Sequence, residues 1–163
     1  MAFSTIIDRN ELTELACLLI PVEGKNLILP NVSVAEIVGY LFPVAEDDTP
    51  EWFLGMVNWR GQEVPLVSFD ALNGQTVPDF LVANRLAIIN TTGIDDKLLW
   101  IGIVTQYTPR LMRVGAQEIN ELEGEELAPM EVMAVTVNGE EAVVPNIDLL
   151  QQKYLQFRKG QPK

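Results

Sequence analysis

The stretch GMVNWRGQEVPLV, residues 55–67, predicts a β-hairpin. An apolar run lies on each side of a polar centre, in which Asn58 and Gly61 suit a tight turn. The tip of this hairpin is expected to present Trp59 and Arg60 outward. The same pattern, an apolar run that ends in turn residues, recurs along the rest of the chain.

Ten apolar runs of this kind are separated mostly by Gly, Pro and Asn. They cover Ala16 to Val22, Leu27 to Leu29, Ile37 to Leu41, Gly55 to Val57, Val64 to Phe69, Leu86 to Ile89, Leu98 to Val104, Leu111 to Val114, Met133 to Val137, and Ala142 to Val144. Strands at this spacing are typical of an all-β protein with few short helices. Because Pro21, Pro65 and Pro145 suit strand edges or ends, small barrels fit better than one broad sheet.

Two of the predicted hairpins, residues 22–32 and 137–147, are similar at a constant offset of 115 residues. Each reads as a strand, a glycine turn, a second strand and a Pro-Asn exit. In that exit, proline favours the end of the strand and asparagine can cap a following helical turn. The similarity is either chance or the mark of two related lobes.

Helical patterns are few. A C-terminal helix is expected over residues 146–160, with Asn146 or Asp148 as its cap and Gly160 as its stop. One apolar face of this helix should pack on a barrel; it consists of Ile147, Leu150, Tyr154 and Phe157. A single helical turn is expected from Thr49 to Phe53, and residues 118–131 are expected to form a solvated connector.

Composition excludes several functional classes. The chain carries 23 acidic and 11 basic side chains, a formal charge of −12, so DNA and anionic membrane surfaces would repel it. It has no histidine and one cysteine, Cys17, which is expected to be buried. This excludes catalytic sites that need histidine and the common zinc sites. With no apolar run of about 20 residues and no basic leader, we expect a cytoplasmic protein without membrane insertion.

No catalytic, metal or cofactor site is indicated. The clusters Glu46 to Asp48 and Glu123 to Glu126 lack calcium-loop spacing, and no carboxylate pair is singled out, although a carboxylate hydrolase stays a minor alternative. Arg60 is unusual, because it is the only cation between Lys25 and Arg85 in a segment with eight carboxylates. Beside Trp59 it has the composition of an interface hot spot; equally, it could pair with Glu36 or Glu63 and fix the turn.

The segments 33–40 and 49–67 closely resemble the V-x-E-I and P-x4-G-x2-N-L-R-G signatures of CheW-like chemotaxis adaptor proteins. Residues 84–90, 100–104 and 139–150 resemble later strands and the closing hairpin of the same family. The resemblance implies two SH3-like five-stranded β-barrels sharing a core over residues 15–151, after an N-terminal segment 1–14. It also implies a protein without enzymatic activity or cofactor.

In this family the adaptor couples the cytoplasmic tip of methyl-accepting chemoreceptors to the regulatory domain of a CheA-type histidine kinase. The resemblance implies receptor contacts at matching positions of this chain, namely Val34, Glu36, Gly55, Asn58, Trp59, Arg60 and Gly61. It implies kinase contacts at Asn31, Val32, Leu41, Phe42 and Val44.

The sequence departs from the family pattern at several positions. Trp59 stands where Leu is usual, and Ser68 and Phe69 replace an Asp-Leu pair. These departures favour a divergent adaptor, such as one serving type IV pili. An alternative is an auxiliary regulator of such a twitching pathway, which would bind the kinase without coupling it to receptors.

Overall fold

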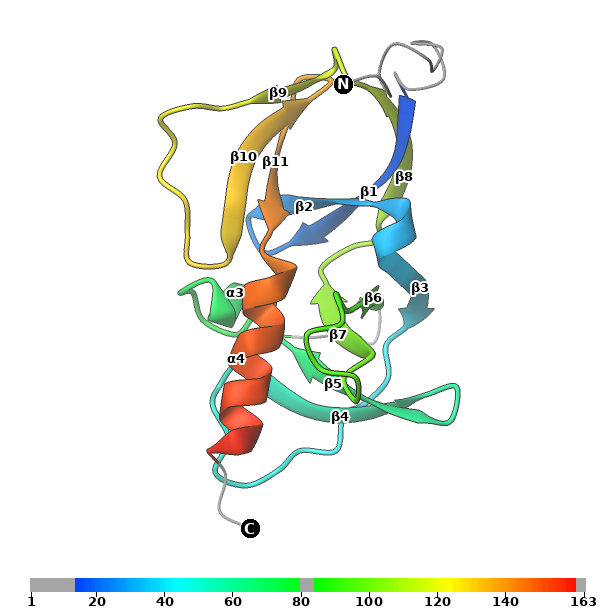
Figure 1. Cartoon of the computed structure of the whole chain (residues 1–163), viewed down its shortest axis with the longest axis vertical. Coiled ribbons are helices and arrows are strands. Elements are labelled where there is room, and N and C mark those ends of the chain that lie inside the picture. The colour runs from blue at the N-terminus through cyan, green and yellow to red at the C-terminus, as the bar shows by residue number, and fades with distance from the viewer. Residues whose placement is uncertain (1–13, 80–83, 161–163) are drawn as a thin grey trace.

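A computed structural model of the protein describes residues 14–79 and 84–160, which form two sheets and a C-terminal helix (Figure 1). The first sheet has six strands in the order β8-β1-β2-β11-β10-β9. Their bounds are Glu14–Val22 for β1, Lys25–Pro30 for β2, Arg110–Gly115 for β8, Ile119–Glu121 for β9, Glu131–Val137 for β10 and Glu140–Pro145 for β11.

The second sheet has five strands in the order β3-β6-β7-β5-β4. Their bounds are Val34–Gly39 for β3, Phe53–Trp59 for β4, Gln62–Val67 for β5, Arg85–Asn90 for β6 and Trp100–Thr105 for β7. Each sheet contains one parallel pair, β2 with β11 and β5 with β7, and its other pairs are antiparallel. All ten predicted runs therefore contribute to strands.

Apolar packing confirms a shared core between two barrel-like sheets. One buried cluster combines the two sheets and the helix, with Leu27 from the first sheet, Ile103 from the second and Leu150 from the helix. Each sheet also encloses a smaller cluster of its own. In the described residues the end strands of neither sheet pair with each other, so the barrels are open.

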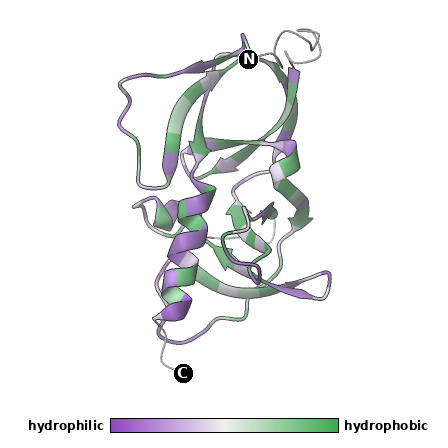
Figure 2. Ribbon diagram, in the orientation of Figure 1, coloured by the Kyte–Doolittle hydropathy of each residue, from purple (hydrophilic) through white to green (hydrophobic). Residues whose placement is uncertain are grey.

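The helix α4 (Ile147–Lys159) begins and ends as the sequence predicts. Asn146 is its cap, because the side-chain Oδ1 accepts the backbone N–H of Leu149 at 3.0 Å. Gly160 follows its last residue. Apolar and polar residues share its surface, and it lies along the side of the five-stranded sheet (Figures 1 and 2).

Four local predictions differ from the structure. Residues 50–53 form a β-turn and not the predicted turn of helix; the N–H of Phe53 donates a hydrogen bond to the carbonyl of Pro50. The predicted connector 118–131 contains β9. The strand predicted through Phe69 ends at Val67, since Ser68 caps a short helix, α3 (Phe69–Leu72). The two similar hairpins lie side by side in one sheet, so they do not represent one lobe each.

Cys17 is buried as predicted, with 2% of its surface exposed. Burial raises the pKa of its thiol. A neutral thiol in apolar surroundings is unreactive, so this side chain contributes packing rather than chemistry.

Candidate functional site

The turn between β4 and β5 has an uncommon backbone. Trp59 pairs with Gln62, which leaves Arg60 and Gly61 as the two loop residues, with φ angles of +50° and +76°. Two positive φ values are those of a type I′ turn, which strand twist favours. The Asn58 side chain accepts the N–H of Gly61 at 3.2 Å and supports the turn. Asparagine or glycine normally occupies the first position, so an arginine held there is a strained residue that suggests function.

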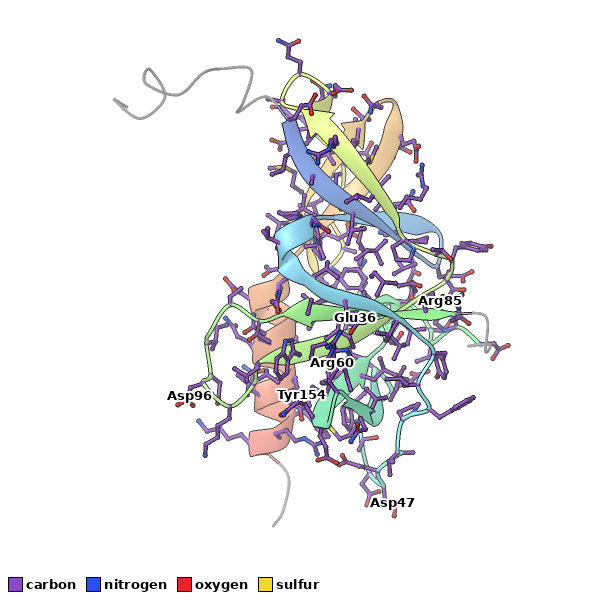
Figure 3. The ribbon with its side chains drawn as sticks, turned by 90° about the vertical axis from the view of Figure 1, so that its right-hand side faces the viewer. Glu36, Asp47, Arg60, Arg85, Asp96 and Tyr154 are labelled. Carbon is purple, nitrogen blue, oxygen red and sulfur yellow. The ribbon has the colours of Figure 1, made fainter. Side chains whose placement is uncertain are left out.

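Glu36 joins the hairpin tip to strand β3. Its Oε1 atom accepts hydrogen bonds from Trp59 Nε1 at 2.8 Å and from Arg60 Nε at 2.9 Å. The bond from Arg60, and then that from Trp59, lowers the pKa of the Glu36 carboxyl, and the same contact raises the pKa of Arg60. Because β3 and β4 lie at opposite ends of the five-stranded sheet, these side-chain contacts join its two end strands, and Glu36 and Arg60 lie close together in Figure 3.

Trp59 does not point outward as predicted. Only 9% of its surface is exposed, and its ring meets that of Trp100 edge to face at 5.0 Å. The Arg60 side chain, by contrast, is 68% exposed although it pairs with Glu36. The structure therefore confirms the pairing of Arg60 with Glu36, and it leaves the guanidinium exposed to solvent, as an interface residue would have to be.

A β-bulge sets the direction of the side chains on β3. Val34 pairs with Ile89 and Glu36 pairs with Ile88, so Ala35 is the extra residue. The bulge changes the alternation of faces, and both Val34 and Ile37 then pack on the shared core. Glu36 is thereby directed toward the hairpin tip.

The predicted receptor residues divide into three places. Glu36, Asn58, Trp59, Arg60 and Gly61 gather at the hairpin tip. Val34 lies half-buried at the start of β3. Gly55 is buried beneath the backbone of Val44 and the side chain of Pro43, so it cannot offer a surface to a partner.

The predicted kinase residues form two patches at opposite ends of β3. Asn31 and Val32 lie in the 3₁₀ turn η1 (Asn31–Ser33), where Val32 is 83% exposed. The second patch follows the strand and comprises Leu41, Phe42 and Val44. Leu41 is half-buried, whereas Phe42 and Val44 are each 73% exposed. Six residues of strand, roughly 20 Å, separate the two patches.

A buried polar cluster joins the two sheets, and sequence reasoning did not find it. Asn73, just after α3, accepts the N–H of Met130 at 2.9 Å and donates to Glu131 at 2.7 Å. Glu131 also pairs with Lys25 of β2. Asp70 of α3 accepts the N–H of Glu23 at 3.0 Å, and burial raises its pKa. The partners lie 47 to 106 residues apart, so no local motif indicates them.

Replacing Glu131 with Gln is expected to lower the free energy of unfolding at pH 7 by about 2 kcal/mol. Burial alone would raise the pKa of Glu131, but hydrogen bonds from Lys25, Asn73 and the N–H of Ala128 outweigh it and hold the pKa below that of an ordinary glutamate. A carboxyl whose pKa falls on folding adds stability above its unfolded pKa, and that stability disappears as the pH drops through the folded value.

Urea denaturation at pH 7, 5 and 3.5 tests this role of Glu131. The difference between the wild type and Glu131→Gln should shrink as the pH falls below about 5. Glu140→Gln is the matched control, because Glu140 pairs with Arg110 at an exposed site and should have little effect. A difference that stays constant with pH would contradict the assignment.

In residues 14–79 and 84–160, no three His, Cys, Asp or Glu side chains are grouped closely enough to hold a metal ion. None of the helices in the described part of the chain has the length and apolar character to cross a membrane.

Comparisons with known proteins agree with the fold and with the motifs. The family model of the CheW-like domain matches residues 16–153. The structure is similar to that of the scaffolding protein TtCheW from Thermoanaerobacter tengcongensis, with a TM-score of 0.68 and 14% sequence identity over 80% of this chain and 88% of that chain. No curated protein sequence matches the chain. Because the family match spans most of its length, the chain belongs to the CheW-like domain family.

Proposed function

We propose that the protein is a cytoplasmic, non-enzymatic adaptor that couples chemoreceptors to a CheA-type histidine kinase. The observation that carries the proposal is the hairpin tip, where an exposed arginine occupies a strained turn and is oriented by Glu36. An oriented, exposed guanidinium can bind a carboxylate or carbonyl of a partner at a low cost in side-chain entropy.

The receptor would contact the tip through Arg60, Asn58 and Gly61, and Val34 would make a separate apolar contact at the start of β3. Trp59 is buried beside Trp100, so it would not touch the receptor; it would orient Glu36 through the hydrogen bond from its indole N–H. Gly55 would act indirectly, by allowing the backbone of Val44 to lie against β4. The kinase regulatory domain would contact the exposed apolar side chains at either end of β3, Val32 on one side and Phe42 and Val44 on the other.

Trp59 favours one alternative. Leucine, usual at this position, has no N–H in its side chain, whereas the Trp59 indole adds a second hydrogen bond to the oxygen atom of Glu36 that Arg60 uses. This departure from the family's usual leucine favours a divergent role, such as an auxiliary regulator in a type IV pilus pathway that binds the kinase without coupling it to receptors.

Separate binding measurements distinguish the two roles. Titrations of the full chain with the kinase regulatory domain and with a receptor tip fragment, both from the source organism, should show binding to both if it is an adaptor. Binding to the kinase domain alone would favour the auxiliary regulator. Binding to neither would overturn both proposals.

A further inference from the structure

The segment between β3 and β4, residues 40–52, carries two exposed apolar side chains on a backbone with little regular structure. All of these residues are described, and they contain one isolated bridge, Val44 with Met56, and no helix. Phe42 and Val44 are two positions apart around this bridge, so in an extended backbone they project on the same side. The rings of Phe42 and Tyr40 are T-shaped to each other, with their centres 5.2 Å apart.

Two backbone contacts seat this segment on β4. The N–H of Val44 donates to the carbonyl of Met56 at 2.8 Å, and the N–H of Met56 donates back at 3.3 Å. Gly55 makes the approach possible, because a Cβ atom there would lie 2.3 Å from the Val44 carbonyl oxygen and 3.1 Å from the Pro43 Cβ. Pro43 thus faces inward while its two neighbours are exposed.

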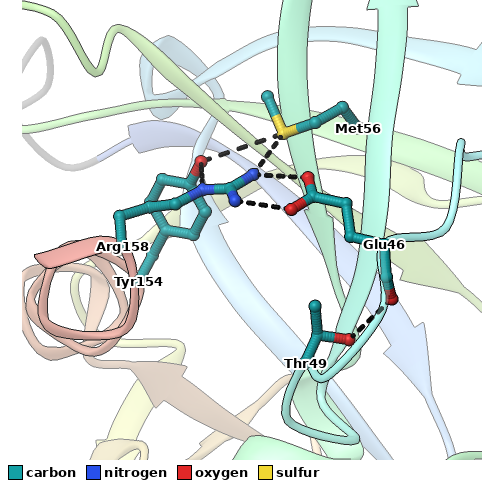
Figure 4. A network of polar contacts seen from close by, with 5 residues as sticks. All are labelled: Glu46, Thr49, Met56, Tyr154 and Arg158. Carbon is teal, nitrogen blue, oxygen red and sulfur yellow. Dashed lines mark hydrogen bonds and ion pairs between the residues drawn. The ribbon is translucent and has the colours of Figure 1, made fainter. Parts of the chain in front are cut away.

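A third contact comes from the far end of the chain, on α4. Arg158 donates to both carboxylate oxygens of Glu46, each at 2.7 Å, in a bidentate pair (Figure 4). Its Nε donates to the hydroxyl of Tyr154 at 2.9 Å, and its Nη2 lies 3.3 Å from the sulfur of Met56. Glu46, 112 residues away in sequence, is thereby tied to the helix.

Aromatic rings fix the guanidinium of Arg158 itself. Its central carbon lies 4.9 Å from the ring centre of Phe53, 5.2 Å from Phe157 and 5.4 Å from Tyr154. The pair with Glu46 is the main reason that the pKa of Arg158 is raised. A guanidinium that lies within about 6 Å of three ring centres and is hydrogen-bonded to both Glu46 and Tyr154 has little freedom, so it can restrain the loop that it holds.

We propose that Arg158 is a positioning residue, which holds residues 42–46 so that Phe42 and Val44 enter an apolar pocket with a basic rim on the kinase regulatory domain. The inference rests on the proposed function and extends it. A free loop would have to be ordered on binding, and restraining it beforehand removes that entropic cost. The apolar pair would serve as the anchor of the contact.

Charge identifies the kind of partner. Asp47, Asp48 and Glu51 are exposed beside the apolar pair, and Asp47 projects from the loop (Figure 3). A complementary surface therefore needs Lys or Arg around its apolar centre. A second copy of this chain is a poor candidate, because its charge is −12 and Arg60 is the only cation between Lys25 and Arg85.

Titration of the kinase regulatory domain with single variants of the full chain tests the proposal. Phe42→Ala and Arg158→Ala should each weaken binding about tenfold or more, and Arg158→Lys should recover part of the loss. Affinity for the receptor tip fragment should stay unchanged. Arg110→Ala is the matched control, because it removes another ion pair, with Glu140 on the six-stranded sheet.

Two further readouts separate positioning from general stability. Hydrogen exchange should become faster at residues 42–46 in Arg158→Ala and in Glu46→Gln, which breaks the pair from its other side. The double variant Asp47→Asn/Asp48→Asn should reduce the salt dependence of kinase binding. The backbone should tolerate this change, because asparagine readily adopts the positive φ that Asp48 has, +56°.

Each other outcome overturns the proposal at a defined point. Full kinase affinity in both Arg158→Ala and Glu46→Gln would show that Arg158 does not position the loop for kinase binding. Full kinase affinity in Phe42→Ala would show that this side chain is not part of the kinase contact. Binding of the wild-type chain to the kinase domain would still support the proposed function. Self-association that Phe42→Ala abolishes would identify a second copy as the occupant. A wild-type chain that does not bind the kinase domain would overturn both this inference and the proposed function.

Discussion

Arg60→Glu is expected to weaken binding to a receptor tip fragment about 30-fold or more, with the thermal midpoint of the protein nearly unchanged. The guanidinium is 68% exposed and its ion pair with Glu36 lies at the surface, so its loss should cost little stability. Reversing the charge replaces the proposed anchor with a repulsive group next to Glu36. Isothermal titration gives the affinity, and circular dichroism gives the thermal midpoint.

Arg110→Glu is the control for this variant. Arg110 and Glu140 form an exposed pair on the other sheet, with side chains 57% and 43% exposed, and reversal changes the net charge by the same amount. Receptor affinity should be retained in the control. If both variants lost receptor affinity equally, the cause would be the change in net charge and not the position of Arg60. Unaltered receptor affinity in Arg60→Glu would show that Arg60 is not the anchor.

Gly55→Ala is expected to destabilise the protein by about 3 kcal/mol. The backbone of Gly55 has a φ of +129°, which L-residues rarely adopt, and an added Cβ would lie 2.3 Å from the carbonyl oxygen of Val44. The clashing atom belongs to the backbone, so the segment must move away from β4. Urea denaturation followed by the fluorescence of the three tryptophans measures the change.

Gly61→Ala separates the two causes of that loss. Gly61 also has a positive φ, +76°, but nothing lies within 4 Å of its added Cβ. It should cost only about 1 kcal/mol, the strain of the backbone alone. If both glycine variants cost the same, the close approach of Val44 would contribute nothing, contrary to the account of how residues 42–44 are seated.

The strands could be predicted because each depends on local sequence. An apolar run bounded by Gly, Pro or Asn specifies a strand wherever a core is available to cover it. Each of the ten runs contributes to a strand. The short strand β9 escaped prediction because Ile119–Glu121 contains one apolar residue and depends on its pairing with β10. Similarly, Phe69 continues the apolar run of β5 in the sequence, but the strand ends before it because the Ser68 side chain caps the short helix α3.

The site could be predicted only in part, because contacts across the fold decide it. Glu36 and Arg60 were singled out by motif and charge, and the structure places them 2.9 Å apart. Trp59 was expected outward, since a residue next to a turn is usually exposed; the partner that buries it, Trp100, is 41 positions further on. No feature near Arg158 or Glu46 indicates their pairing, which depends on how α4 lies against the five-stranded sheet.

The most direct test of the account is whether one chain holds both partners at once. Beads carrying the receptor tip fragment should retain the kinase regulatory domain only when the full chain is present, and Arg60→Glu should abolish that retention. The amount of kinase retained should follow the amount of adaptor bound. If the kinase domain instead displaces the chain from the receptor beads, the two surfaces are not independent and the account of a bridging adaptor is contradicted.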